Sequence, residues 1–289
     1  MKNAAAKPVP TEIQIKEDDL NKIRGLIYKE TGMLFEDNKN YYLDSRIRQR
    51  MAAVGSQDFK DYFHELVFGD RSGEVKHFVE AITINETYFF RDFPQLQGFA
   101  DEVLPRYCAA KQAAGDKSLN IWSAACSTGE EPYTLSIILQ EVFDDPREWN
   151  LKIYGTDIDR TVLAQASEGR FTDRSVKDVP SAYKSKYFQK TGDLWRILPN
   201  ARGLVNLKEL NLIDRSQMRQ MRKLDFIFCR NVLIYFDDES RKKVVSMLYD
   251  ALAPGGYLFL GHSESVGRIT AAFELERMGE FLCYKRPRT

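Results

Sequence analysis

The sequence predicts a chain of two parts: a small all-helical domain, then an α/β domain built on a doubly wound, mostly parallel sheet. Three observations lead to this expectation. Apolar residues recur at helical spacing before residue 84, and from about residue 118 short apolar runs alternate with helical segments. The length of 289 residues suits a catalytic domain with a smaller companion.

The helical domain is predicted over residues 16–84, after a flexible tail of residues 1–15. Its first helix covers about residues 18–31 and should stop at Gly32, since glycine easily adopts the left-handed conformation that ends many helices. The second helix should begin after a cap at Asp37. Apolar stripes mark the buried faces of the second, third and fourth helices: Leu43, Ile47, Met51 and Val54; Phe59, Phe63, Leu66 and Val67; Val75, Phe78, Val79 and Ile82.

The α/β domain is predicted over residues 85–289. Strands are expected at LNIWSAA, LKIYGTD, LDFIFCR, GYLFLGH, FELERM and FLCYKR, and helices at about 132–143, 161–169 and 239–252. The stretch between Tyr187 and Asn211 breaks this alternation. It is interpreted as a short antiparallel meander with TGD and PNARG as turns, within a β-subdomain inserted at about residues 171–210.

Composition excludes several classes of function. The 42 basic and 42 acidic residues cancel, so bulk charge favours neither nucleic acid nor an anionic membrane. Four scattered cysteines are expected to be reduced core residues, and the three dispersed histidines predict no metal site. MKNAAAKPVP does not resemble a signal peptide, and no apolar run reaches the ~20 residues that cross a bilayer. A soluble, cytoplasmic protein without membrane insertion is expected.

The segment IWSAACSTGEEPY combines a strand, a turn of small residues and a helix, which is typical of a nucleotide-like ligand site. A dinucleotide-binding turn would carry several glycines and a helix N-terminus free of acids, whereas this one has Gly129 alone, followed by Glu130 and Glu131. Two carboxylates would repel a pyrophosphate but suit a ligand with an ammonium and a sulfonium. The alternative is that both glutamates only complement the helix dipole.

Polar residues also follow two other predicted strands. Asp157, at the tip of KIYGTD, is placed to accept hydrogen bonds from both ribose hydroxyls of a nucleoside; the alternative is a helix cap, which Asp159 could provide equally well. Arg230 and Asn231 interrupt the apolar segment FIFCRNVLIYF. Because buried unpaired polar groups are costly, both should lie at the exposed carboxyl end of the strand, facing the ligand.

Five blocks in order, NETYFFRD, WSAACSTGEEPY, YGTDID, FCRNVLIYF and LFLGHSES, make the chain resemble the chemotaxis receptor protein-glutamate O-methyltransferases, the CheR family, from about residue 15 onward. The resemblance implies an all-helical domain joined to a class I methyltransferase domain with a small antiparallel β-subdomain. It further implies S-adenosylmethionine as cofactor, S-adenosylhomocysteine as product, and receptor glutamates as substrate. The cofactor-binding residues that it implies are Asn85, Thr87, Arg91, Glu131, Asp157, Asn211, Leu212, Arg230 and Asn231.

Catalytic roles follow from the same resemblance. Arg91 is expected to orient the incoming carboxylate and Tyr235 to line the methyl-transfer passage; without the resemblance, Thr87 would be taken for a helix cap, Tyr235 for a core residue and Arg91 for part of a surface ion pair. A carboxylate is ionised at neutral pH, so no general base is required. Positioning and exclusion of water would then account for the catalysis.

Partner binding is also implied. Lys39, Arg46 and Arg50 should form a basic ridge on the second helix, and in the family that helix docks the receptor; the alternative is a solvated face. The TGD turn is shorter than in relatives that bind a receptor tail peptide, so tight binding of that peptide is not expected. A methyltransferase of another protein, nucleic acid or small molecule, a nicotinamide-dependent oxidoreductase and a non-enzymatic adaptor remain the alternatives.

Overall fold

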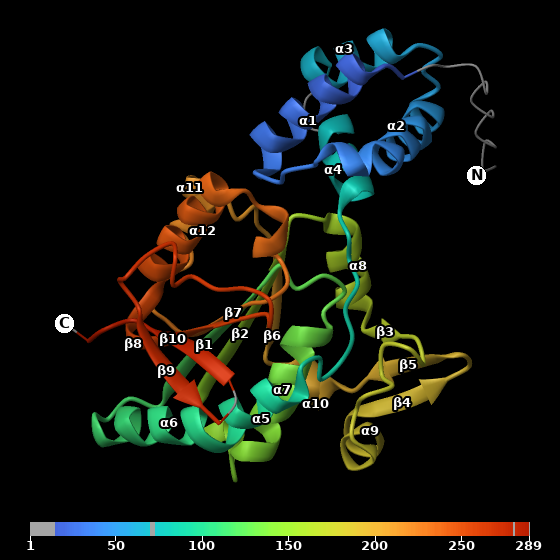
Figure 1. Cartoon of the computed structure of the whole chain (residues 1–289). Coiled ribbons are helices and arrows are strands. Elements are labelled where there is room, and N and C mark those ends of the chain that lie inside the picture. The colour runs from blue at the N-terminus through green and yellow to red at the C-terminus, as the bar shows by residue number, and fades with distance from the viewer. Residues whose placement is uncertain (1–14, 70–72, 280, 289) are drawn as a thin grey trace. The chain divides into compact units, whose positions relative to one another are not determined.

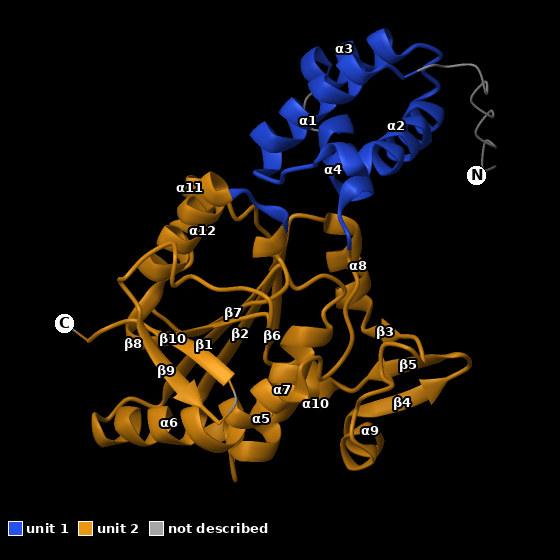
Figure 2. Cartoon of the chain, in the orientation of Figure 1, with its two compact units in different colours: residues 1–84, 235–237 blue, residues 85–234, 238–289 orange. Residues whose placement is uncertain are grey.

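The computed structural model describes residues 15–69, 73–279 and 281–288, and these divide into two compact units (Figure 2). The helical unit holds the described residues up to Ile84 together with Tyr235–Asp237. The α/β unit holds Asn85–Ile234 and the described residues from Asp238 onward. The chain therefore leaves the α/β unit after Ile234, contributes Tyr235–Asp237 to the helical unit, and returns to the α/β unit at Asp238.

The helical unit contains the four predicted helices (Figure 1). They are α1 (Glu17–Thr31), α2 (Asn40–Val54), α3 (Phe59–Phe68) and α4 (Glu74–Ile82). Gly32 ends α1 with φ of 73°, as the sequence predicts. The apolar stripes meet in one core, whose buried members are Leu20, Ile23, Ile27, Leu43, Ile47, Met51, Phe59, Tyr62, Leu66, Phe78 and Ile82.

Two expectations for α2 are wrong. Asp37 does not cap α2, because a 3-10 turn (η1, Asp37–Lys39) precedes the helix and the Asp37 carboxylate instead pairs with Arg24 at 3.0 Å. Val54 is 44% exposed rather than part of the core. It is the last residue of α2, directly before the left-handed Gly55, so the buried stripe ends one turn earlier, at Met51.

The α/β unit is built on a seven-stranded sheet of order β6-β2-β1-β7-β8-β10-β9. Its parallel part consists of β6 (Val205–Glu209), β2 (Asn150–Asp157), β1 (Ser118–Ala124), β7 (Leu224–Cys229) and β8 (Leu252–Leu260). An antiparallel pair, β10 (Phe281–Lys285) and β9 (Glu274–Met278), completes it. The six predicted strands are all present, and the doubly wound class of fold is confirmed.

Helices connect these strands and pack on the sheet (Figure 1). The three predicted crossover helices are α7 (Glu130–Val142), α8 (Arg160–Glu168) and α12 (Asp238–Ala251). Phe99 lies at the centre of an aromatic cluster, with its ring centroid 5.0 Å from that of Phe226 and 5.2 Å from that of Phe228. The remaining helical segments are α5 (Phe93–Gly98), η2 (Phe99–Val103), α6 (Leu104–Ala113), η3 (Pro146–Glu148), α9 (Ser181–Tyr187), α10 (Pro199–Arg202), α11 (Arg215–Met218) and η4 (Leu233–Tyr235).

The predicted meander is wrong in its second half. The small antiparallel sheet has the order β3-β5-β4, from β3 (Arg170–Phe171), β5 (Leu194–Ile197) and β4 (Phe188–Thr191). The PNARG segment is the short helix α10 rather than a hairpin turn, and the following strand β6 pairs in parallel with β2 in the main sheet. Val205 and Leu207 alternate with exposed residues, a pattern that fits either sheet, so the sequence alone could not identify the partner strand.

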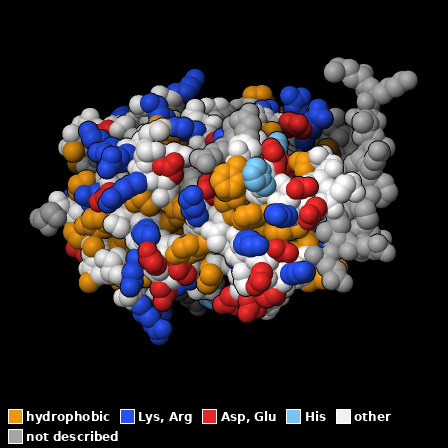
Figure 3. Space-filling view, turned by 90° about the horizontal axis from the view of Figure 1, so that it is seen from above, with side chains coloured by type: hydrophobic (Ala, Val, Ile, Leu, Met, Phe, Trp, Pro, Cys, Tyr) orange, Lys and Arg blue, Asp and Glu red, His pale blue; other side chains and the backbone are white. Residues whose placement is uncertain are grey.

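Three expectations from the composition can be compared with the structure: the cysteines, the surface charge and the membrane-spanning helices. All four cysteines are free and buried, as predicted. The face shown in Figure 3 carries interspersed acidic and basic side chains, in keeping with a formal net charge of zero. Among the described helices, none combines the length and the apolar character that a membrane span requires.

Candidate cofactor site at the carboxyl ends of the parallel strands

The predicted site residues of the α/β unit follow strands that end at the same edge of the sheet. Strands β1, β2 and β7 run parallel and in register, so Ala124 lies beside Thr156 and Ser123 beside Phe228. The turns that leave these strands must therefore lie close together. In doubly wound sheets this edge is where ligands bind.

The turn after β1 is held in an unusual backbone conformation. Ala125, Ser127 and Gly129 all have positive φ, at 58°, 50° and 94°. A Cβ at Gly129 would lie 2.8 Å from the Cβ of Ala166, so only glycine allows α7 to begin this close to α8. Ala125 and Ser127 adopt positive φ without being glycine, so the turn has only one position at which a side chain would clash.

Asp157 accepts hydrogen bonds from two backbone N–H groups. Its Oδ2 accepts from Ser127 N at 2.8 Å and its Oδ1 from Asp159 N at 3.0 Å. Asp159, rather than Asp157, caps α8, accepting from Thr161 N at 2.8 Å and Val162 N at 3.2 Å. Burial raises the pKa of Asp157 to about 6. The carboxylate therefore stands at the strand tip without serving as the cap of the next helix.

The two glutamates at the start of α7 have different environments. Glu130 is 2% exposed, lies in the first turn of α7 and accepts from Thr128 Oγ1, just before the helix, at 2.6 Å, which fits the helix-dipole interpretation. Glu131 accepts from Ser123 Oγ at 2.7 Å and from Arg230 Nη1 at 3.2 Å. Burial raises the pKa of Glu131, and the Arg230 guanidinium opposes that rise.

Arg230 connects three segments of the chain. Besides Glu131, its guanidinium donates through Nη2 to the Arg91 carbonyl at 2.6 Å and to Asp92 Oδ2 at 2.7 Å. Its side chain is only 3% exposed. The structure thus pairs two predicted site residues, Glu131 and Arg230, with each other, and it adds Asp92, which the sequence analysis did not single out.

Asn231 follows directly and is held by a residue that the sequence analysis missed. Glu264 accepts the N–H groups of Asn231 at 2.8 Å, Leu233 at 2.7 Å and Gly261 at 2.7 Å. Asn231 has φ of 60°, and within the described residues its buried Oδ1 has no hydrogen-bond partner. The motif LFLGHSES contains Glu264, but only the structure shows that its side chain folds back to the backbone N–H of Gly261, directly after β8.

The NETYFFRD segment places Asn85 beside this edge. Asn85 Nδ2 donates to Asp159 Oδ2 at 2.9 Å, and its carbonyl accepts from Ser127 Oγ at 3.0 Å. Thr87 is partly buried and does not cap a helix, because the N-cap of α5 is Asp92.

Arg91 comes from the same segment. Its Nη1 donates to the Glu86 carbonyl at 3.1 Å, and its guanidinium lies 5.7 Å from the centre of the Tyr88 ring. It forms no ion pair with any residue in the described ranges, so the surface ion pair considered from sequence is not present there.

Asn211 and Leu212 follow strand β6. Leu210 N donates to the Asp157 carbonyl at 2.9 Å, which brings this segment to the tip of β2. Asn211 Oδ1 accepts from Ile213 N at 3.2 Å, and Leu212 is buried. These residues therefore lie near Asp157, as predicted for a shared site, although the sequence analysis placed β6 in the small antiparallel sheet rather than in the main sheet.

Three predicted residues lie in the helical unit. The Tyr235 carbonyl accepts from Leu34 N at 2.9 Å, and its catalytic role stays a prediction. Arg46 Nη1 donates to Gln49 Oε1 at 3.1 Å, and its guanidinium lies 4.9 Å from the Tyr42 ring centre. Arg50 instead binds Glu74 through both Nε, at 3.0 Å, and Nη2, at 2.5 Å. The ridge therefore contains one arginine that is already paired.

The acceptors at this sheet edge fit an S-adenosylmethionine molecule. Asp157 and Glu131 supply carboxylate oxygens for hydroxyl and ammonium donors, and the unpartnered Asn231 Oδ1 offers a buried acceptor that a ligand could satisfy. The doubly wound fold and these acceptors are those expected of an S-adenosylmethionine-dependent methyltransferase.

Comparison with known proteins specifies the family. Residues 85–281 match the family model described as "CheR methyltransferase, SAM binding domain", and residues 18–83 match "CheR methyltransferase, all-alpha domain". This chain belongs to the CheR methyltransferase family, whose members named below act in chemotaxis.

Curated relatives are similar along almost the whole chain. "Chemotaxis protein methyltransferase 2" of Vibrio cholerae is 38% identical, covering 96% of this chain and 95% of the relative. "Chemotaxis protein methyltransferase" of Escherichia coli is 31% identical, covering 91% and 90%. Among solved structures, magnesium protoporphyrin IX methyltransferase from Synechocystis covers 78% of this chain and 96% of its own, with 16% identity and a TM-score of 0.34.

Proposed function

We propose that this protein transfers a methyl group from S-adenosylmethionine to glutamate side chains in the cytoplasmic domain of chemoreceptors, forming glutamyl methyl esters. The observation that carries the proposal is Arg91. This partly buried guanidinium forms no ion pair with a carboxylate among the described residues, although its charge opposes the rise that burial causes in the pKa of Glu131; its own carbonyl binds Arg230, which in turn binds Glu131. A cation beside the cofactor residues is suited to pair with a substrate carboxylate.

The residues on this edge divide the work of binding and positioning. Asp157, Glu131 and Asn231 would hold the cofactor, which when bound supplies a methyl group on a positively charged sulfur. Arg91 orients the substrate glutamate, whose pKa of ~4.3 leaves it ionised at neutral pH, so the protein needs no base to remove a proton. Because opposite charges neutralise each other during transfer, exclusion of water from the edge favours the reaction.

A methyl-transfer assay tests this proposal. The full chain, labelled S-adenosylmethionine and purified receptor cytoplasmic domains should give labelled receptor that releases methanol in mild base. Arg91→Ala should lower kcat/KM by about a hundredfold, since positioning of a reactant can be worth several kcal/mol. Arg174→Ala, which removes an exposed arginine paired with Glu86, is the matched control and should change kcat/KM little.

Other outcomes would replace the proposal. Label that resists mild base would indicate methylation of an amine or amide. Transfer to nucleic acid or to a small molecule, but not to receptor, would favour the alternative substrates instead. Label transfer unchanged in Arg91→Ala would remove Arg91 from carboxylate recognition.

We further propose that the receptor is methylated without tight capture of its tail. The turn between β4 and β5 is only Gly192 and Asp193, and β4 is an edge strand with three exposed residues, Gln189, Lys190 and Thr191. Such a turn offers little backbone to clamp a peptide beside that edge. Calorimetric titration with a receptor tail peptide should give no low-micromolar Kd; such a Kd, lost when residues 191–197 are altered, would contradict this.

A further inference from the structure

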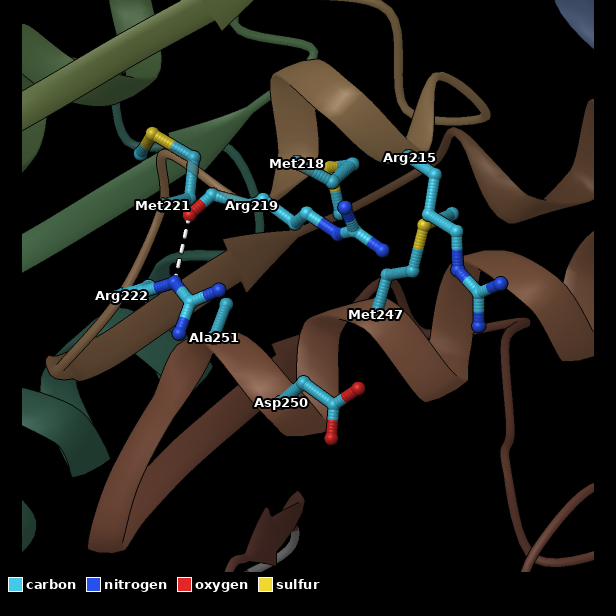
Figure 4. Close-up of a pocket in the computed structure, with 8 residues that line it drawn as sticks. All are labelled: Arg215, Met218, Arg219, Met221, Arg222, Met247, Asp250 and Ala251. Atoms are coloured by element: carbon cyan, nitrogen blue, oxygen red, sulfur yellow. Dashed lines mark hydrogen bonds between the residues drawn. The ribbon is translucent and has the colours of Figure 1, made fainter.

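A pocket of about 340 Å³ lies in the α/β unit between the α11 segment and α12 (Figure 4). It has no lining residue in common with the predicted cofactor site. Three arginines from one short stretch of chain, Arg215, Arg219 and Arg222, line it, and Figure 4 shows Met247 and Asp250 on the neighbouring helix. Its volume lies in the range of small-molecule sites, which begins at about 300 Å³.

Among the residues that the structure describes, no carboxylate pairs with any of the three arginines. Within the described ranges none of them forms an ion pair, whereas Arg230, Arg50 and several surface arginines do. Like charges this close together repel one another, and a bound anion would relieve the repulsion. In a chain whose formal net charge is zero, such a cluster is a local feature rather than a consequence of composition.

The stretch that carries the arginines is fixed rather than loose. Asp214 caps α11 by accepting from Ser216 N at 2.8 Å and Gln217 N at 3.2 Å. Arg222 Nε donates to the Arg219 carbonyl at 2.7 Å, the dashed line in Figure 4. The backbone beneath the guanidinium groups is therefore held in place before any ligand arrives.

The rest of the lining is not that of a simple anion site. Met218 and Met221 are buried and Met247 is partly buried, so thioether side chains form the apolar surface of the pocket. Thioethers pack favourably against flat rings. Asp250 adds a carboxylate that would repel a bare polyanion but can accept hydrogen bonds from ring N–H groups.

We propose that this pocket binds a guanine nucleotide, with its phosphates on Arg215, Arg219 and Arg222, its base against the methionines and its ring N–H groups on Asp250. A diphosphate matches the arginine forks, and a guanine edge presents adjacent N–H donors to one carboxylate. A guanine nucleotide therefore has one group for each part of the lining: phosphates for the arginines, a flat ring for the methionines and N–H donors for Asp250.

Calorimetry with guanosine diphosphate tests this, using the full chain saturated with S-adenosylhomocysteine so that the nucleotide cannot occupy the cofactor site. Binding should be one to one and at least about tenfold tighter than that of pyrophosphate. Arg219→Ala with Arg222→Ala should weaken it at least about tenfold. Lys242→Ala with Arg268→Ala removes two exposed cations outside the pocket and should leave it nearly unchanged.

Two further variants separate the contributions. Arg219→Lys with Arg222→Lys keeps the charge but removes the forked geometry, so it should also weaken binding in a folded protein. Asp250→Ala should weaken guanosine diphosphate yet leave pyrophosphate binding equal or stronger. The proposal is overturned by absence of binding, by equal loss in the control variant, by pyrophosphate binding as tightly as the nucleotide, or by stronger nucleotide binding in Asp250→Ala.

Discussion

Glu264 Oε2 accepts the backbone N–H of Asn231 at 2.8 Å and holds that residue at φ of 60°, a conformation that asparagine adopts at some cost. The same oxygen also accepts Gly261 N at 2.7 Å. One carboxylate therefore ties the turn after β7 to the turn after β8. Glu264, which is outside the predicted site, thus fixes the position of Asn231, which is part of it.

Replacement of Glu264 by glutamine should weaken both fold and site. The amide has one acceptor oxygen in place of two, and its NH₂ group would face a backbone N–H. We expect a loss of about 1.5–3 kcal/mol in the free energy of unfolding, measured with urea, and weaker cofactor binding by calorimetry. Glu239→Gln, which removes only the exposed pair with Lys243, should change neither. Wild-type cofactor affinity in a folded Glu264→Gln would deny it a positioning role.

Cofactor binding should depend on pH through Asp157. Its pKa is raised to about 6, so the proton-bound form increases as pH falls from 7 to 5 and the carboxylate loses acceptor capacity. Affinity for S-adenosylhomocysteine should thus be highest above pH 7 and fall through pH 6. Asp157→Asn should bind more weakly at pH 8 and lose most of this dependence. An unaltered pH profile in that variant would assign the titration to another group, of which Glu131 is the first candidate.

Arg230 and Glu131 should behave as a coupled pair. Arg230→Met leaves the carboxylates of Glu131 and Asp92 without their shared cation, which we expect to cost about 3–5 kcal/mol of folding free energy. Adding Glu131→Gln should recover part of that loss, because it removes one uncompensated charge. A double-mutant cycle in urea measures the coupling. Strictly additive losses would show that the contact at 3.2 Å contributes little.

Two arginines of the basic ridge, Arg50 and Arg46, should have different roles, one in stability and one in receptor binding. Arg50 binds Glu74, which also accepts from Tyr62 at 2.9 Å, so Arg50→Ala should lower the stability of that unit by about 2 kcal/mol. Arg46 has no such carboxylate. Arg46→Ala should leave stability unchanged and raise the KM for receptor, more at low salt. Receptor kinetics that are insensitive to Arg46 at every salt concentration would leave it a solvated residue.

Local patterns were enough to predict much of this molecule. Gly32 ends α1, and the apolar runs form strands whose tips carry Asp157 and Asn231. These features were predictable because the spacing of apolar residues and the residues that end helices act over only a few positions. Pairings across long separations were not predictable. The bond from Arg230 to Asp92 spans 138 positions, and the partner strand of β6 depends on which sheet presents a free edge. Neither leaves a pattern in the sequence.

The helical unit includes Tyr235–Asp237, which reach it from the middle of the second unit. There Phe236 forms a β-bridge with Met33, and Tyr28 donates to Asp237 at 3.0 Å. A fragment cut after residue 84 would lose these partners. The two units thus alternate along the chain rather than following one another, so that grafting the helices onto another methyltransferase would also require this short return segment.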